Sequence, residues 1–234
     1  MLDKTNVLLI AGALVLAVAL FGPYAAAERA VPLPAPSTEV IAALSKPAKD
    51  REIAVFAGGC FWGVQAVFQH TKGVLNAVSG YAGGAASQAD YSSVSGGSTG
   101  HAEAVQITFD PTQISYAQLL QIFFSVAHDP TQLDRQGPDR GTQYRSAIFY
   151  TSPGQKLASD RYVAQLDTAN VFPDKIVTQL GSLQAFYPAE KYHQNYATLH
   201  PNDGYIARFD KPKIANLQKL MPAVYRDVPV LVAQ

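Results

Sequence analysis

The sequence predicts an α/β protein of the α+β two-layer sandwich type, with a ferredoxin-like split βαβ core and a mixed or antiparallel sheet. Three observations favour this fold class. Strand-like and helix-like segments alternate in the order β-α-β, then β-α-β, so each helix can cross one face of a single sheet. Hydrophobic residues make up 48% of the 234 residues, enough for one sizeable core. Long polar loops separate the segments, and loops of this length are usually functional.

Five segments are expected to be strands and three to be helices. β-branched and aromatic residues bounded by glycine or proline mark the strands, whereas apolar residues three or four positions apart mark the helices. The stripe from Tyr116 to Phe124, which Ser115 can cap, is the clearest helical pattern. The residues from 186 onward have little periodicity and are expected to wrap around the domain. The strands are predicted at 52–56, 73–81, 102–109, 145–151 and 175–180, and the helices at 61–68, 115–128 and 153–169.

The N-terminus has the layout of an export signal. Lys4 precedes an uncharged apolar run over residues 7–21, and small residues at Ala25–Ala27 follow a Gly-Pro pair. The run is short for a full membrane span, which needs about 20 residues. Residues 1–27 are therefore interpreted as a signal peptide or a membrane anchor.

This interpretation places the protein in the periplasm or cell envelope. It is expected to be soluble after cleavage near Ala27, or anchored to the membrane by residues 7–27. Residues 28–50, which carry three closely spaced prolines, are predicted to be a linker. Residues 51–234 are predicted to form the catalytic domain.

The composition argues against several kinds of partner. Eighteen basic and eighteen acidic side chains cancel, and no basic patch with interleaved aromatics is present, so nucleic-acid binding is not expected. A single cysteine excludes an internal disulfide and any multi-thiolate metal site. Scattered histidines make only a weak case for a metal, and no bound cofactor is expected.

Cys60 is the strongest candidate for chemistry. It lies where a predicted strand meets a predicted helix, after Gly58-Gly59 and before Phe61-Trp62. A thiol at a helix N-terminus faces unpaired N–H groups, so the thiolate is expected to be favoured. The alternative is that Cys60 is a small buried hydrophobe, as many free cysteines are.

A thiol nucleophile needs a proton source, and the polar loops supply candidates. Burial of Glu103 would raise its pKa and keep it protonated. Taken alone, however, a glutamate at the end of a strand is expected to lie on the surface more often than in the core. Tyr91 and Tyr144 can donate hydrogen bonds to an oxygen, or merely pack. Asp139 can be a turn residue or can hold a substrate amide. The sequence does not decide which histidine, if any, pairs with the thiol, and the candidates are His101, His128, His193 and His200.

Taken together, the motifs resemble those of the A-type peptide methionine sulfoxide reductases. The match runs in order from about residue 53 to residue 199, and several ordered motifs are far more specific than any one of them. The motifs are Gly-Cys-Phe-Trp-Gly at 59–63, Gly-Tyr-Ala-Gly-Gly at 80–84, Tyr91, Thr-Gly-His-Ala-Glu at 99–103, Asp-Pro at 129–130, Gln-Gly at 136–137, Asp139, Gly-Thr-Gln-Tyr-Arg-Ser at 141–146 and Tyr-His-Gln at 192–194.

The resemblance implies a role for each candidate. Cys60 is similar to the nucleophile that attacks the sulfoxide sulfur, leaving a sulfenic acid, and Glu103 to the proton donor. The family acts on the S epimer of methionine sulfoxide, free or in oxidised proteins and peptides, and so repairs oxidative damage. The remaining roles fall to Tyr91 and Tyr144, which polarise the oxygen, Phe61 and Trp62, which hold the S-methyl group, and Asp139, which holds the substrate main chain.

The chain departs from many family members in having no resolving cysteine. Members often carry one near the C-terminus, or one in the loop where Ser95 stands here. The sulfenic acid is therefore expected to need an external thiol, such as a thioredoxin-like protein, glutathione with glutaredoxin, or a dithiol. Gln65 stands where glutamate is common, and we expect it to lie away from the chemistry.

Two other functions remain open at this stage. A thiol peroxidase would use Cys60 against hydroperoxides and would consume peroxide without any sulfoxide. A non-catalytic envelope module would bind oxidised peptides equally well after Cys60→Ser and show no turnover.

Overall fold

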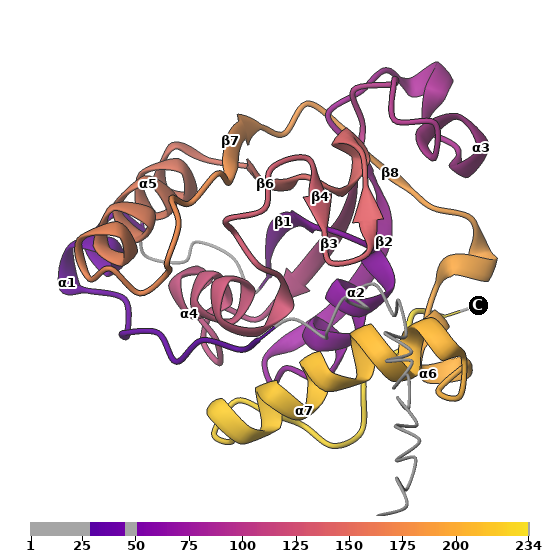
Figure 1. The fold of residues 1–234 in the computed structure, drawn as a ribbon. Coiled ribbons are helices and arrows are strands. Elements are labelled where there is room, and N and C mark those ends of the chain that lie inside the picture. The colour runs from indigo at the N-terminus through magenta and orange to yellow at the C-terminus, as the bar shows by residue number, and fades with distance from the viewer. Residues whose placement is uncertain (1–28, 45–50, 234) are drawn as a thin grey trace, which may run out of the picture.

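The computed structural model describes residues 29–44 and 51–233, and there a layer of helices packs on a mixed six-stranded sheet (Figure 1). The strands are β1 (Glu52–Gly58), β2 (Val74–Ala82), β3 (Ala102–Phe109), β6 (Ser146–Tyr150), β7 (Gln179–Ser182) and β8 (Phe186–Pro188). Their order across the sheet is β7-β6-β1-β3-β2-β8. Neighbours are antiparallel except β6 and β7, which are parallel.

The four central strands confirm the ferredoxin-like split βαβ prediction. Helix α2 (Phe61–Gln69) connects β1 to β2, and β3 lies between these two strands. Helix α4 (Tyr116–Ile122), continued by a π-helical turn at Phe123–Ala127, connects β3 to β6, with β1 between them. Ser115 and Gln118 form a capping box that starts α4. Helix α5 (Pro153–Thr168) begins at the predicted proline.

The period-two alternation of β3 decides which side chains face the helices. Val105, Ile107 and Phe109 belong to the main core between sheet and helices. Ala102 and Ala104 belong to a smaller cluster on the opposite face. Every odd-numbered position of β3 therefore faces the helical layer, and Glu103 lies in the same row.

The two long loops fold locally. Residues 83–101 contain a 3-10 turn at Ala86–Gln88 and helix α3 (Tyr91–Val94), whose N-cap is Asp90. Residues 129–145 contain the two-stranded hairpin of β4 (Arg135–Gln136) and β5 (Asp139–Arg140), followed by a 3-10 turn at Thr142–Tyr144.

The C-terminal region is more regular than the sequence predicts. The expected strand at 175–180 lies at β7 instead, and the wrapping segment contains β8, helix α6 (Tyr196–Leu199), a π-helical turn at Ile206–Asp210 and helix α7 (Lys211–Leu220). In α7 only Lys213 and Leu217 are buried, too narrow a stripe to show as helical periodicity. Helix α7 packs against α2 (Figure 1), so this region reaches the start of α2.

Residues 29–44 also differ from expectation, because they lie on the domain instead of forming a free linker. Helix α1 (Thr38–Ala42), capped by Ser37, packs against α5, and Val40 is buried. Before it, the Val31 backbone N–H donates to the Ser125 carbonyl at 2.9 Å. The predicted signal or anchor at residues 1–27 lies outside the described residues. Within 29–44 and 51–233, no helix has the length and apolarity to cross a membrane.

Candidate active site

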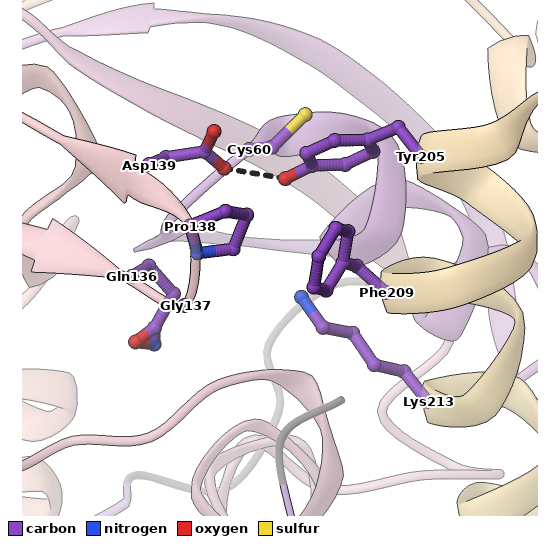
Figure 2. Close-up of a pocket in the computed structure, with 8 residues that line it drawn as sticks. All are labelled: Cys60, Gln136, Gly137, Pro138, Asp139, Tyr205, Phe209 and Lys213. Carbon is purple, nitrogen blue, oxygen red and sulfur yellow. Dashed lines mark hydrogen bonds between the residues drawn. The ribbon is translucent and has the colours of Figure 1, made fainter. Parts of the chain in front are cut away.

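Cys60 occupies the N-cap position of α2, two residues after β1 ends at Gly58. Gly59 permits the turn between them, because its φ is 86° and a Cβ there would lie 2.5 Å from side-chain carbons of Gln136. The loop at 129–145 consequently packs directly against the thiol's turn. Figure 2 shows the pocket beside Cys60. The hydrogen bond from Tyr205 Oη to Asp139 Oδ2 lies at the edge of this pocket. Its lining residues are Cys60, Gln136, Gly137, Pro138, Asp139, Tyr205, Phe209 and Lys213.

The electrostatics of Cys60 correct one expectation. The helix N-terminus was expected to favour the thiolate, yet the pKa of Cys60 is raised well above its ordinary value. Burial is the largest cause, followed by negative charge on Glu103 and on Asp210, while a hydrogen bond from the Trp62 backbone N–H acts in the opposite direction. Cys60 therefore rests as a neutral thiol, and charge on its acidic neighbours opposes its ionisation.

Glu103 is buried, with 2% of its surface exposed. The expectation that Glu103, taken alone, lies on the surface is wrong, because the alternation of β3 points its side chain into the helical layer. The Phe61 backbone N–H at the start of α2 donates to Glu103 Oε2 at 3.0 Å. Burial raises the pKa of Glu103 to about 8, with the Phe61 N–H acting in the opposite direction. The carboxyl group is thus protonated at neutral pH. It is hydrogen-bonded to Phe61, the residue that directly follows Cys60.

The other predicted polar residues gather around the same point. The pKa of Tyr144 is raised by burial and then by Glu103, Asp139, Cys60 and Tyr91, and the pKa of Tyr91 by burial and then by Glu103 and Cys60. Tyr91 comes from α3 and remains about one-third exposed, whereas Tyr144 and Asp139 come from the 129–145 loop and are half-buried. The two polar loops therefore meet at the start of α2.

The aromatic residues form one continuous wall. Phe61 is buried, with its ring 5.9 Å from that of Tyr81 and 5.0 Å from that of His193. Trp62 is half-buried and stacks on Tyr196, with ring centroids 3.9 Å apart and planes 13° from parallel. The Tyr205 ring meets Trp62 edge-on at 6.1 Å.

The sequence patterns did not predict five residues at the site, all from the C-terminal region: Tyr196, Tyr205, Phe209, Asp210 and Lys213. Tyr196 lies two residues after the Tyr-His-Gln motif, so extending that motif by two residues would have found it. Nothing in the local pattern marks the other four, because α7 and the turn before it have no clear apolar stripe.

The four candidate histidines have different surroundings. His128 is buried, bonding through its ring nitrogens to the Phe123 carbonyl and the Ser146 hydroxyl, and burial lowers its pKa to about 3. The His101 ring is held by the backbone of Gly84 and Ala85. His200 is exposed. His193 is buried against Phe61 and Trp62, the two residues that follow the thiol.

Within residues 29–44 and 51–233, no group of three or more His, Cys, Asp or Glu side chains is arranged to hold a metal ion.

Comparison with known proteins places these features in one family. A family model described as peptide methionine sulfoxide reductase matches residues 52–223. Peptide methionine sulfoxide reductase MsrA 2 of Mesorhizobium japonicum is 57% identical over 187 residues, which cover 80% of this chain and 96% of that protein. The MsrA of Deinococcus radiodurans is 50% identical over 175 residues, covering 75% of this chain and 84% of that protein.

Solved structures agree with the sequence matches. Reduced Mxr1 from Saccharomyces cerevisiae is 33% identical, with a TM-score of 0.59, covering 68% of this chain and 90% of that one. Methionine sulfoxide reductase A of Corynebacterium diphtheriae is 31% identical, with a TM-score of 0.56, covering 76% of this chain and 87% of that one.

Proposed function

We propose that this chain, which belongs to the peptide methionine sulfoxide reductase family and reduces methionine sulfoxide, uses Cys60 as the nucleophile of that reduction. The observation that carries the proposal is the pairing of the only thiol with a buried, protonated carboxyl group. Glu103 bonds to the backbone N–H of the residue after Cys60, and its pKa of about 8 keeps a transferable proton at neutral pH.

In the first half-reaction, Cys60 Sγ attacks the sulfoxide sulfur while Glu103 gives its proton to the sulfoxide oxygen. The thiol proton replaces the one that Glu103 has given. The oxygen then ends as a hydroxyl group on Cys60 Sγ, a sulfenic acid, and the methionine thioether leaves. The thiol has been oxidised and the sulfoxide reduced by two electrons.

The surrounding side chains assist this step. Tyr91 and Tyr144 donate hydrogen bonds to the oxygen, and their raised pKa values keep both phenols protonated. Phe61 and Trp62 hold the S-methyl group against an apolar wall, where water is scarce. Asp139 accepts a hydrogen bond from the substrate main chain, in place of or beside the one that it now accepts from Tyr205.

Regeneration requires a thiol from outside the chain, since Cys60 is its only cysteine. A first external thiol displaces water from the sulfenic acid and forms a mixed disulfide. A second thiol then attacks this disulfide and releases the Cys60 thiol. A thioredoxin-like dithiol protein, glutathione with glutaredoxin, or a small dithiol all supply these two thiols.

The substrate is the S epimer of methionine sulfoxide, in oxidised proteins and peptides or as the free amino acid. Because the first 27 residues resemble an export signal, the proposed place of this repair is the periplasm or cell envelope. A mass spectrum of the protein from cell envelopes tests the export proposal, since cleavage after Ala27 leaves Glu28 as the first residue.

The deciding experiment compares wild type, Cys60→Ser and Glu103→Gln on the two epimers of a methionine sulfoxide peptide with excess dithiol. Wild type should reduce the S epimer, Cys60→Ser should be inactive, and Glu103→Gln should lose at least about a hundredfold in rate, the usual contribution of a general acid. Activity that survives Cys60→Ser, or equal reduction of both epimers, would overturn the mechanism.

The same samples address the two other functions. A peroxidase would consume hydroperoxide faster than sulfoxide. A non-catalytic binding module would show no turnover even as wild type, and its Cys60→Ser variant would bind the sulfoxide peptide as tightly. A single turnover without reductant should leave one added oxygen on Cys60, detected by a reagent specific for sulfenic acids.

A further inference from the structure

His193 joins the two sides of the site. Its Nδ1 accepts a hydrogen bond from Trp62 Nε1 at 3.2 Å, and its Nε2 lies 3.9 Å from Glu190 Oε2. Only 2% of the His193 surface is exposed, and its buried Nε2 makes no hydrogen bond, with the Glu190 carboxylate within ion-pair distance. The ring is therefore a buried link between the substrate-facing indole and an acidic group.

The hydrogen bond from Trp62 fixes the protonation state of this imidazole. The indole N–H is a donor only, so His193 Nδ1 must carry a lone pair and the proton of the neutral ring must be on Nε2. A second proton could add only at Nδ1, where it would meet the indole N–H as donor against donor. Protonation of His193 is thus incompatible with the observed orientation of Trp62.

Glu190 connects His193 to Tyr91. Glu190 Oε1 accepts from the Tyr91 backbone N–H at 2.9 Å, and Oε2 accepts from Tyr81 Oη at 2.9 Å. The Tyr91 ring also packs on His193, with centroids 4.6 Å apart. The same imidazole hence contacts the side chain proposed to bind the S-methyl group and a phenol proposed to bind the oxygen.

The segment that carries His193 is itself fixed to α2. The two residues after it, Gln194 and Asn195, bond to the buried Gln65 side chain: Gln65 Nε2 donates to Gln194 Oε1 at 2.8 Å, and the Asn195 N–H donates to Gln65 Oε1 at 2.9 Å. Since Trp62 and Gln65 lie on the same helix, the distance between His193 and the indole is set by covalent geometry and two buried bonds.

We propose that His193 is a positioning residue that orients Trp62 for substrate binding, and that it does so only as the neutral imidazole with its proton on Nε2. The proposal rests on the proposed function in one respect, the placing of Trp62 in the substrate pocket. Protonation of His193 releases the indole and weakens sulfoxide binding, so affinity falls as the solution becomes acidic.

The groups facing His193 support this direction. Burial lowers the pKa of His193 and the Glu190 charge opposes this, so the neutral form prevails at neutral pH. The other titratable neighbours are phenols: Tyr91 and Tyr192 pack on the ring, and Tyr81 reaches it through Glu190. These phenols stay uncharged below neutral pH, which leaves Glu190 and His193 as the groups that titrate.

Trp62 is the only tryptophan of the chain, so its fluorescence reports on this contact without substrate. In wild type, the emission should change on acidification with a midpoint below the ordinary imidazole pKa, because protonation of His193 breaks its hydrogen bond with the indole. His193→Asn, whose Oδ1 can replace Nδ1 as acceptor, and His193→Phe should both abolish this transition. His200→Asn should keep it, although His200 packs on Tyr196 next to Trp62.

Kinetics then separate positioning from catalysis. His193→Phe should raise KM about tenfold, the effect of one lost hydrogen bond, with kcat within about twofold, and His193→Asn should restore KM toward wild type. A fluorescence transition that persists in His193→Phe or disappears in His200→Asn would overturn the proposal, as would a loss confined to kcat. Inactive wild type with the transition intact would instead contradict the proposed function alone.

Discussion

At the scale of single residues, Glu103, the proposed acid, shows how burial holds a proton on a carboxyl group at a cost in stability. In an unfolded chain its carboxyl group ionises near 4.5, whereas in the folded protein the pKa is about 8. Between these values the folded state holds a proton that the unfolded state has released, so stability falls as the pH rises through this window. Below about 4.5 both states are protonated and the difference disappears.

Replacing this acid should therefore stabilise the protein increasingly as the pH rises from about 4.5 to about 8. Above about pH 8 we expect Glu103→Gln to raise the free energy of unfolding by a few kcal/mol, because the amide is never ionised. Near pH 4 the variant and wild type should be alike. Urea unfolding at both pH values measures this, with Glu39→Gln as the control at an exposed position. An equal gain at both pH values would contradict the assigned pKa.

The same ionisation should limit the reaction. If Glu103 donates the proton as proposed, the single-turnover rate should fall as the pH rises through about 8, approaching tenfold per unit. Single turnover without reductant is the proper measurement, because external thiols ionise in the same range. A rate that increases steadily up to pH 9 would show that Cys60 ionisation, not the Glu103 proton, controls the step.

At the scale of elements, the contact between α2 and the C-terminal region requires a glycine at position 63. A Cβ on Gly63 would lie 2.1 Å from Asp210 Oδ1. Asp210 is fully buried and its Oδ1 lies 3.7 Å from Lys213 Nζ. Burial raises the pKa of Asp210 to about 6 and Lys213 acts in the opposite direction, so the pair is ionised at neutral pH. Gly63 thus lets a buried ion pair lie against the first turn of α2.

Gly63→Ala should consequently destabilise the protein by about 1–3 kcal/mol, the usual cost of overpacking, although alanine favours helix over glycine by about 1 kcal/mol. Gly204→Ala is the matched control, since its Cβ would meet nothing within 4 Å. Urea unfolding compares the two variants. Similar stability in both would show that the Asp210 side chain can move aside without loss.

The elements also show what the sequence can and cannot predict. The strand at 102–109 was predicted with its observed ends, because alternating apolar residues leave one register in which Val105, Ile107 and Phe109 are buried. Extending that alternation by two residues would have placed Glu103 in the core. No such pattern marks α7, in which only Lys213 and Leu217 are buried.

The same contrast applies to the site. Cys60, Glu103, Tyr91, Tyr144 and Asp139 could be proposed from motifs, since each lies in a stretch with a strong local pattern. Tyr205 and Asp210 reach the thiol only through packing of the chain's last helices, a tertiary effect that local pattern does not contain. The His193 to Trp62 hydrogen bond spans 131 positions and is equally invisible in the sequence.

At the scale of the whole molecule, the N-terminal arm, residues 29–44, holds one side of the helical layer. The Ser125 hydroxyl donates to the Val31 carbonyl at 2.6 Å, and Tyr162 Oη donates to the Pro34 carbonyl at 3.0 Å. Val40 is buried in the main core. In Figure 1 the helix of this arm, α1, lies beside α5 at the edge of the domain, and no residue of the arm lines the Cys60 pocket.

Removing the arm should therefore lower stability without changing the reaction. A variant starting at residue 51 should lose a few kcal/mol in the free energy of unfolding relative to one starting at residue 29, since it gives up the burial of Val40 and leaves the buried Ser125 hydroxyl without its carbonyl partner. The urea midpoint should fall, while kcat/KM for the sulfoxide peptide stays within about twofold. Equal urea midpoints would mean that the arm only rests on the domain, and a large loss of activity in the folded variant would mean that its contacts extend to the start of α2.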